Sequence, residues 1–244
     1  MAEVKGLTYV PEIYEEILKN VTLNNESQAL EVGIGFGQAT APILETGAKI
    51  IALEPNETVA TVCKETFADN ENLSVITTKF EDYEAENESF DLVYSASAFH
   101  EVNQEIGYTK AYAMLKKGGI FARFSNHAMR AIERPYLSAA IQKLYAIYLP
   151  KTGTPRPYKE IQAQKRAEIA LKYGFEEISY KRYYRTRVYT TEELIEYLKT
   201  DEDHLDISET KREAFFNELR KLMERYGGKI TYYDTIDLQI AKKI

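Results

Sequence analysis

The first half of the chain alternates short apolar runs with longer stretches of mixed apolar and polar residues. The apolar runs read as buried strands, and they cover residues 29–32, 49–53, 73–77, 90–94 and 120–124. Helix-like stretches lie before and between them, at residues 11–19, 40–45, 57–68 and 105–115. Strands that alternate with helices form a parallel sheet covered by helices on both faces. The pattern therefore predicts an α/β fold with a mostly parallel sheet.

The second half breaks this alternation after Asn126. Its pattern predicts, in order, a helix over 135–149, a helix over 158–172, a long strand over 175–189, two further helices and a last strand over 229–241. Apolar positions recur at the spacing of one helix face in the first of these. A capping-box sequence, Thr190-Thr191-Glu192-Glu193, opens the third helix. The chain thus ends in a region of helices and long strands.

Composition narrows the class of protein. The chain has 244 residues, a net charge of −7 and a single cysteine, Cys63, which excludes an internal disulfide framework and a cysteine-based zinc site. We expect Cys63 to lie in the core, and we expect no metal site. The sequence shows neither a signal pattern nor an apolar run of membrane-spanning length. These features favour a cytoplasmic enzyme or binding domain.

A glycine loop follows the first strand, in Glu31-Val32-Gly33-Ile34-Gly35-Phe36-Gly37. The dinucleotide fingerprint needs its third glycine at position 38, where this chain has Gln38. A carboxylate so close to the loop suits a cationic amino-acid group better than a pyrophosphate, which favours S-adenosylmethionine over NAD. Glu54 ends the second strand and could hold ribose hydroxyls in either case, so an NAD-dependent oxidoreductase stays an alternative.

Five motifs in order carry a resemblance to a known family: the glycine loop, Ala52-Leu53-Glu54-Pro55-Asn56, Phe80-Glu81-Asp82, Phe90-Asp91-Leu92-Val93-Tyr94-Ser95-Ala96 and Leu115-Lys116-Lys117-Gly118-Gly119. With them the chain resembles class I S-adenosylmethionine-dependent methyltransferases, and more narrowly the small-molecule branch of trans-aconitate methyltransferase-like proteins. The resemblance covers residues 9–126 well and 175–244 more loosely.

The resemblance implies a three-layer Rossmann-like fold, with a mostly parallel seven-stranded sheet and an antiparallel C-terminal strand. It implies one methyltransferase domain over residues 1–244. Within it, we expect a cofactor-binding half (1–127), a helical cap inserted over the acceptor site (128–174) and a C-terminal part that completes the sheet (175–244).

The resemblance also implies the residues around the cofactor. Glu31 and Gly33 are expected near the methionine part, together with Ser95 and Ala96. The nucleoside is expected beside Gly35, Phe36 and Gly37, its ribose on Glu54 and its adenine near Pro55, Phe80 and Glu81. Tyr9 belongs to a Tyr-x-Pro element at which, in some relatives, the N-terminal helix closes over the cofactor. S-adenosyl-L-homocysteine is the product that this chemistry leaves.

Methyl transfer from a sulfonium requires in-line alignment and exclusion of water. A carboxylate acceptor needs no base, whereas a hydroxyl or amine must lose a proton, for which a histidine is suited. His100 and His127 follow the fourth and fifth predicted strands and are the candidate bases. His204, in the acidic sequence Asp201-Glu202-Asp203, is expected on the solvated surface.

A basic segment begins directly after the cofactor-binding half. Residues 128–187 contain 13 Lys/Arg and 5 Asp/Glu. Six basic residues are candidates to attract a carboxylate- or phosphate-bearing small molecule: Arg130, Arg134, Lys181, Arg182, Arg185 and Arg187. Tyr183, Tyr184 and Tyr189 are candidates to line an amphipathic pocket. A solvated basic strand face, pairing with the acidic half and a dimer contact are the alternatives, and the chain is expected to be a monomer or homodimer.

Two other functions stay open. An RNA methyltransferase fits the basic segment, although the net negative charge disfavours nucleic acid. A non-catalytic protein that binds S-adenosylmethionine and acts through partners is the second.

Overall fold

The computed structural model describes residues 8–130 and 133–244. Its strands are β1 (Gln28–Val32), β2 (Lys49–Leu53), β3 (Leu73–Ile76), β4 (Phe90–Ala96), β5 (Leu115–Arg130), β6 (Glu176–Thr190) and β7 (Lys229–Lys242). Its helices are α1 (Pro11–Asn20), α2 (Ala41–Leu44), α3 (Glu57–Thr66), α4 (Gln104–Met114), α5 (Pro135–Tyr148), α6 (Glu160–Glu168), the 3-10 turn η1 (Ile169–Tyr173), α7 (Thr191–Leu198), α8 (Glu202–Leu205) and α9 (Glu209–Arg225). The alternation predicted for the first half is confirmed.

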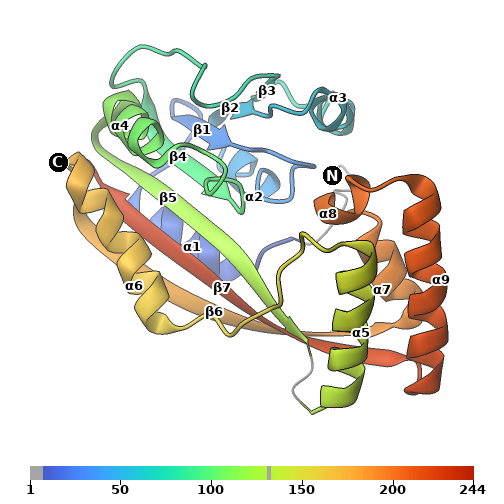
Figure 1. Ribbon diagram of the computed structural model, residues 1–244. Helices are drawn as coiled ribbons and strands as arrows, with labels where there is room; N and C mark the ends of the chain where they lie inside the picture. Colours follow the sequence, from blue (N-terminus) through green and yellow to red (C-terminus); the bar gives the residue numbers. More distant parts are fainter. Residues whose placement is uncertain (1–7, 131–132) are drawn as a thin grey trace. The chain divides into compact units, whose positions relative to one another are not determined.

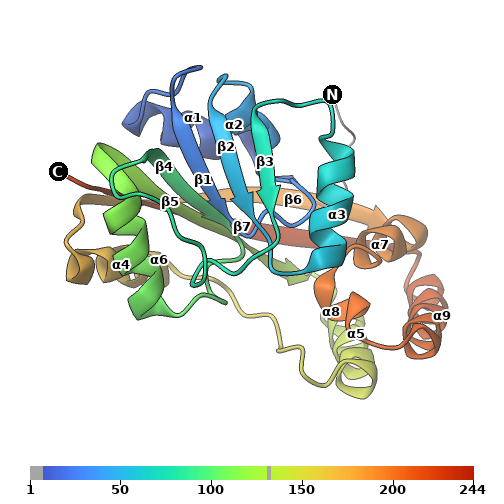
Figure 2. The same ribbon diagram turned by 90° about the horizontal axis from the view of Figure 1, so that it is seen from above.

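The strands form one sheet in the order β3-β2-β1-β4-β5-β7-β6. The pairs β3–β2, β2–β1, β1–β4 and β4–β5 are parallel, and Figure 2 shows β1, β2 and β3 side by side. The end of β7 lies against the beginning of β5, where Gly118 N–H donates to the Lys243 carbonyl at 2.7 Å and Lys243 N–H donates to the Gly119 carbonyl at 3.0 Å. The predicted three-layer Rossmann-like fold with an antiparallel C-terminal strand is confirmed.

The chain divides into two units. Unit 1 contains the residues up to Asn126, residues 159–183 and residues 236–244, whereas unit 2 contains residues 127–158 and 184–235. β5, β6 and β7 each contribute residues to both. The segment 128–174, which the sequence predicts to be an inserted cap, is divided between them. Among the described residues, no helix is long and apolar enough to cross a membrane.

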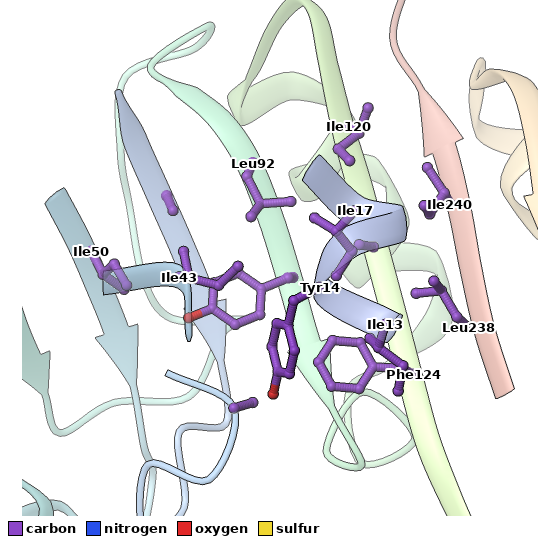
Figure 3. Packing of buried hydrophobic residues seen from close by; sticks show 14 of the residues in the cluster. Ile13, Tyr14, Ile17, Ile43, Ile50, Leu92, Ile120, Phe124, Leu238 and Ile240 are labelled. Carbon is purple, nitrogen blue, oxygen red and sulfur yellow. The ribbon is translucent and has the colours of Figure 1, made fainter. Parts of the chain in front are cut away.

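Unit 1 has a helical layer on each face of its sheet, with α4 and α6 in front and α1 behind in Figure 1. On the α1 face, Ile13, Tyr14 and Ile17 are buried because they recur on one side of the helix. Figure 3 shows these side chains pointing toward strand residues such as Leu92 and Phe124. Cys63 is fully buried in the same cluster, as predicted.

Unit 2 has its own core, built by α5, α7 and α9 together with the adjoining ends of the strands. The predicted capping box opens α7, where Thr190 Oγ1 accepts from the Glu193 N–H. His204 is fully buried at the end of α8, so its prediction as solvated surface is wrong. Tyr145, Phe215 and Phe216 surround its ring. The prediction relied on the acidic residues that precede His204 in the sequence, which are typical of a solvated surface.

Candidate functional site

The glycine loop leaves β1 and turns sharply at its first residue. Gly33 N–H and Ile34 N–H both donate to the Leu53 carbonyl at the end of β2, at 2.9 and 3.0 Å. Gly33 has a φ of +76°, and a Cβ there would lie 2.3 Å from the Ala98 Cβ. Side chains other than hydrogen are therefore excluded for two reasons, conformation and space. The loop lies at the carboxyl edge of the parallel strands, where such folds bind ligands.

Glu54 follows β2 and holds this loop. Its Oε2 accepts from the Gly35 N–H and its Oε1 accepts from the Asn56 N–H, both at 3.0 Å. The side chain is 8% exposed, so the backbone N–H groups fix the direction of the carboxylate. A carboxylate held beside the glycine loop can accept hydrogen bonds from the two hydroxyls of a ribose. Pro55, expected beside an adenine, is exposed next to it.

Glu31 lies at the end of β1 and is fully buried. Thr40 Oγ1 and Tyr94 Oη donate to its Oε2 at 2.7 and 2.8 Å, while Oε1 has no hydrogen-bond partner among the described residues. Burial raises the pKa of the Glu31 carboxyl to about 8, although the two hydrogen bonds favour its ionised form and Glu54 disfavours it. An orphaned carboxylate oxygen at this place fits a cationic group near the loop.

The end of β4 contains a residue that the sequence motifs did not single out. Ser97 has a φ of +59°, and its Oγ accepts from the Tyr9 hydroxyl at 2.7 Å and from the Asn126 N–H at 3.3 Å. Its own O–H is therefore left to donate elsewhere. The strained conformation of Ser97 is the kind found at functional sites, but backbone conformation leaves no mark in a single sequence. Ser95 Oγ donates to the Val32 carbonyl at 2.7 Å, which ties β4 to β1.

The remaining predicted cofactor residues lie around the same edge in unit 1. Phe80 is buried and its ring packs 6.3 Å from that of Phe99. Glu81 accepts from the Asn103 N–H at 2.9 Å. Phe36 is half-buried, and its N–H donates to Gln38 Oε1 at 3.1 Å. Ala96 is also half-buried, at the last position of β4.

The two candidate bases have different surroundings. His100 lies in unit 1 beyond β4; its side chain is 59% exposed and its Nε2 is 2.9 Å from Glu101 Oε1. His127 belongs to unit 2, where its ring stacks on that of Tyr158 with the centroids 3.8 Å apart. Both roles stay predictions. Among the described residues, no cluster of His, Cys, Asp and Glu is placed to hold a metal ion.

Most of the basic candidates have partners inside their own unit. In unit 1, Lys181 pairs with Glu16 at 2.7 Å and Arg182 pairs with Glu160 at 3.2 Å. In unit 2, Arg185 and Arg187 share Asp234, at 3.0 and 2.7 Å.

The other members of that group are placed as follows. Arg134 donates to the carbonyls of Tyr226 and Lys229, and the side chain of Arg130 lies outside the described structure. Tyr183 packs against the α1-face core, and Tyr184 is 67% exposed. Tyr189 contacts Arg187. Most of the basic side chains on β6 are therefore paired with groups of the protein itself.

Part of the chain is similar to known proteins. Residues 30–123 match the family model of a methyltransferase domain. An uncharacterized methyltransferase of Bacillus mycoides is 30% identical over 109 residues, which are 43% of this chain and 50% of that protein. The chain therefore spans about half the length of the curated relatives that it matches. The residues that match the family model, 30–123, include the glycine loop, Glu54 and the whole of β4.

Solved structures share the fold over almost the whole chain. A putative type II methyltransferase from Anaeromyxobacter dehalogenans has a TM-score of 0.65 at 16% identity and covers 96% of this chain and 97% of its own. Phosphoethanolamine N-methyltransferase 2 of Haemonchus contortus, in complex with phosphomonomethylethanolamine and S-adenosylhomocysteine, has a TM-score of 0.55 at 18% identity. It covers 96% of this chain and 52% of its own. The chain thus has the methyltransferase fold.

Proposed function

We propose that this protein is an S-adenosylmethionine-dependent methyltransferase that acts on a small molecule. The observation that carries the proposal is the glycine loop fixed against Glu54, with the buried carboxyl of Glu31 at its base. The match of residues 30–123 to a methyltransferase domain supports it. The narrower likeness to trans-aconitate methyltransferase-like proteins stays a prediction.

The charges around the loop favour a sulfonium cofactor over a dinucleotide. Glu31 and Glu54 are both carboxyl groups, and neither pairs with a cation among the described residues. In their ionised forms these carboxyl groups would repel a pyrophosphate and attract the ammonium of an amino acid. An ammonium near Glu31 would also favour the ionised form of that carboxyl and lower its pKa from about 8.

S-adenosylmethionine supplies an activated methyl group when bound, so the protein has mainly to align the acceptor and exclude water. Ser97, held by Tyr9 and by the backbone of Asn126, has its O–H available to orient a ligand at this edge. For a hydroxyl or amine acceptor, His100 is the candidate base, because its side chain lies beyond β4 and is 59% exposed.

We propose a small acceptor, but we do not assign it a negative charge. The Haemonchus neighbour, whose structure contains a small phosphate-bearing amine, supports the size class. The basic residues that pointed to an anion are largely paired within the protein, as with Lys181 and Glu16. An anionic acceptor would therefore have to be bound by cationic side chains other than those in these ion pairs.

Calorimetric titration with S-adenosylmethionine, S-adenosylhomocysteine and NAD tests the cofactor. We expect both sulfur compounds to bind and NAD to fail. Gly33→Ala should abolish binding because its Cβ collides with Ala98. Gly118→Ala is the matched control, since Gly118 also has a positive φ but has nothing within 4 Å of its added Cβ. Folded wild-type protein that binds neither sulfur compound would refute the proposal.

Transfer from a labelled methyl donor tests the acceptor. Incorporation into small molecules of a metabolite extract, and not into tRNA, is expected. Label in tRNA, with steeply salt-dependent binding, would favour the RNA methyltransferase instead. Tight cofactor binding without transfer to any acceptor class would favour a non-catalytic role.

A further inference from the structure

A second polar site lies inside unit 1, in a hollow that the proposed methyl-transfer chemistry does not use. The hollow is narrow and opens to solvent: about 180 Å³ of non-protein space lies in it and in front of its mouth together, and side chains from α4, β5, α6 and β7 line it. Its polar lining consists of Tyr108, Arg123, Arg166 and Gln239. The sequence motifs pointed to none of these residues.

Arg123 is the unusual member of this lining. It projects from the middle of β5 and is 8% exposed. Its Nη1 donates to the Tyr108 hydroxyl at 2.8 Å, and its guanidinium lies 5.2 Å from the centre of the Phe99 ring. No carboxylate in residues 8–130 or 133–244 forms an ion pair with it. A buried cation without a counter-charge is costly, so an anion from solution would be stabilised beside it.

Gln239 gives an independent indication of a ligand. The residue is 4% exposed; its Nε2 donates to Asp237, and its Oε1 has no hydrogen-bond partner among the described residues. Asp237 is fully buried and also lies 3.5 Å from Arg166 Nη1. That carboxylate is thus engaged by two side chains other than Arg123. The hollow has two cationic groups for one carboxylate, and one acceptor that needs a donor.

We propose that this hollow binds a small oxyanion that retains at least one proton, such as bicarbonate or monohydrogen or dihydrogen phosphate. Its charged oxygens would accept hydrogen bonds from the guanidinium groups of Arg123 and Arg166. Its O–H would donate to Gln239 Oε1 and satisfy the orphaned acceptor. The site is separate from the glycine loop, and the proposal does not depend on the identity of the cofactor.

Thermal unfolding in the absence of cofactor tests this site. At constant ionic strength, bicarbonate or phosphate replaces gluconate, a much bulkier anion with a six-carbon chain. We expect the wild-type midpoint to rise by about 2–4 °C as the site fills. Formate, which has the charge but no O–H at neutral pH, should raise it less. An equal midpoint in all four anions would overturn the proposal.

Variants then assign the effect to the hollow. Arg123→Met should remove the rise, whereas Arg220→Gln, which removes an exposed arginine of unit 2, should keep it. If Arg123→Met does not fold, Arg166→Gln provides the test, because this side chain is 24% exposed and tolerates replacement better. Its response to bicarbonate should be several-fold weaker than that of wild type. A wild-type response in the variant tested would show that the anion acts elsewhere.

Discussion

Two buried acidic residues, Glu31 in unit 1 and Asp234 in unit 2, differ in the hydrogen-bond donors that surround their carboxyl groups. Asp234 is 2% exposed and receives four hydrogen bonds, two each from Arg185 and Arg187. Glu31 is fully buried and receives two, both from neutral hydroxyls. No cation among the described residues pairs with it.

The difference separates a structural ion cluster from a candidate binding site. Arg187 also lies 4.9–5.3 Å from the rings of Tyr189, Tyr197 and Tyr232. Its positive charge is therefore compensated by these rings as well as by the Asp234 carboxylate. Uncompensated polar groups raise the free energy of the folded state, and proteins retain them where a ligand will complete them. Glu31 beside the glycine loop has this property, and Asp234 does not.

Removal of the Asp234 carboxylate should have the largest effect. Asp234→Ala leaves two partly buried arginines without their shared acceptor, and we expect unfolding to cost about 3–5 kcal/mol less than in wild type. Urea denaturation followed by circular dichroism measures this loss. Glu192→Ala, which frees only the exposed Arg220, should leave stability almost unchanged, because exposed ion pairs contribute little. Equal losses in the two variants would contradict the distinction.

The sequence predicted the elements of unit 1 well, because short buried strands and amphipathic helices have distinct periods. It also placed the glycine loop, since tight turns require glycine, whereas the ribose role of Glu54 stays a prediction. It could not predict that His204 is buried, because Tyr145 of α5, 59 residues earlier in the chain, contacts it together with Phe215 and Phe216 of α9. The pairing of Arg185 and Arg187 with Asp234 was hidden for the same reason.

Glu31 itself should give the protein an unusual pH dependence. Its folded-state pKa of about 8 is above its ordinary value of 4.5, so the folded state retains the proton longer than the unfolded state. The stabilising contribution is complete below pH 4.5 and is lost as pH rises through about 8. Across this window a single such group changes the free energy of unfolding by about 1.4 kcal/mol per pH unit.

Glu31→Gln isolates this contribution, because the amide stays neutral throughout. Urea denaturation of ligand-free protein should show wild type losing about 3 kcal/mol more than the variant over two pH units inside the window. Glu26→Gln, at an exposed position just before β1, is the matched control and should follow wild type. A variant that loses stability as steeply as wild type would show that Glu31 does not titrate there.

Glu54→Gln tests the other carboxyl beside the loop. One of its two backbone N–H partners, Gly35 or Asn56, would lose its acceptor, and the negative charge facing the expected ribose would disappear. We expect S-adenosylmethionine to bind about 10–100-fold more weakly, equivalent to roughly 1.4–2.8 kcal/mol. Titration calorimetry measures the change, with Glu57→Gln at the exposed start of α3 as the control. Unchanged affinity would refute the ribose assignment.

Thr40→Val should have the smallest effect on stability. It tests how one hydrogen bond changes the pKa of Glu31. The Thr40 hydroxyl donates to the Glu31 carboxylate at 2.7 Å and so favours its ionised form. Valine has nearly the same shape but no donor, so the pKa of Glu31 should rise above about 8. The loss of stability with pH should begin in the same range but continue to higher pH, with a difference of about 1 kcal/mol at alkaline pH. A curve shifted to lower pH would mean that Thr40 does not stabilise the charged carboxylate, and the two buried acids would then differ for another reason.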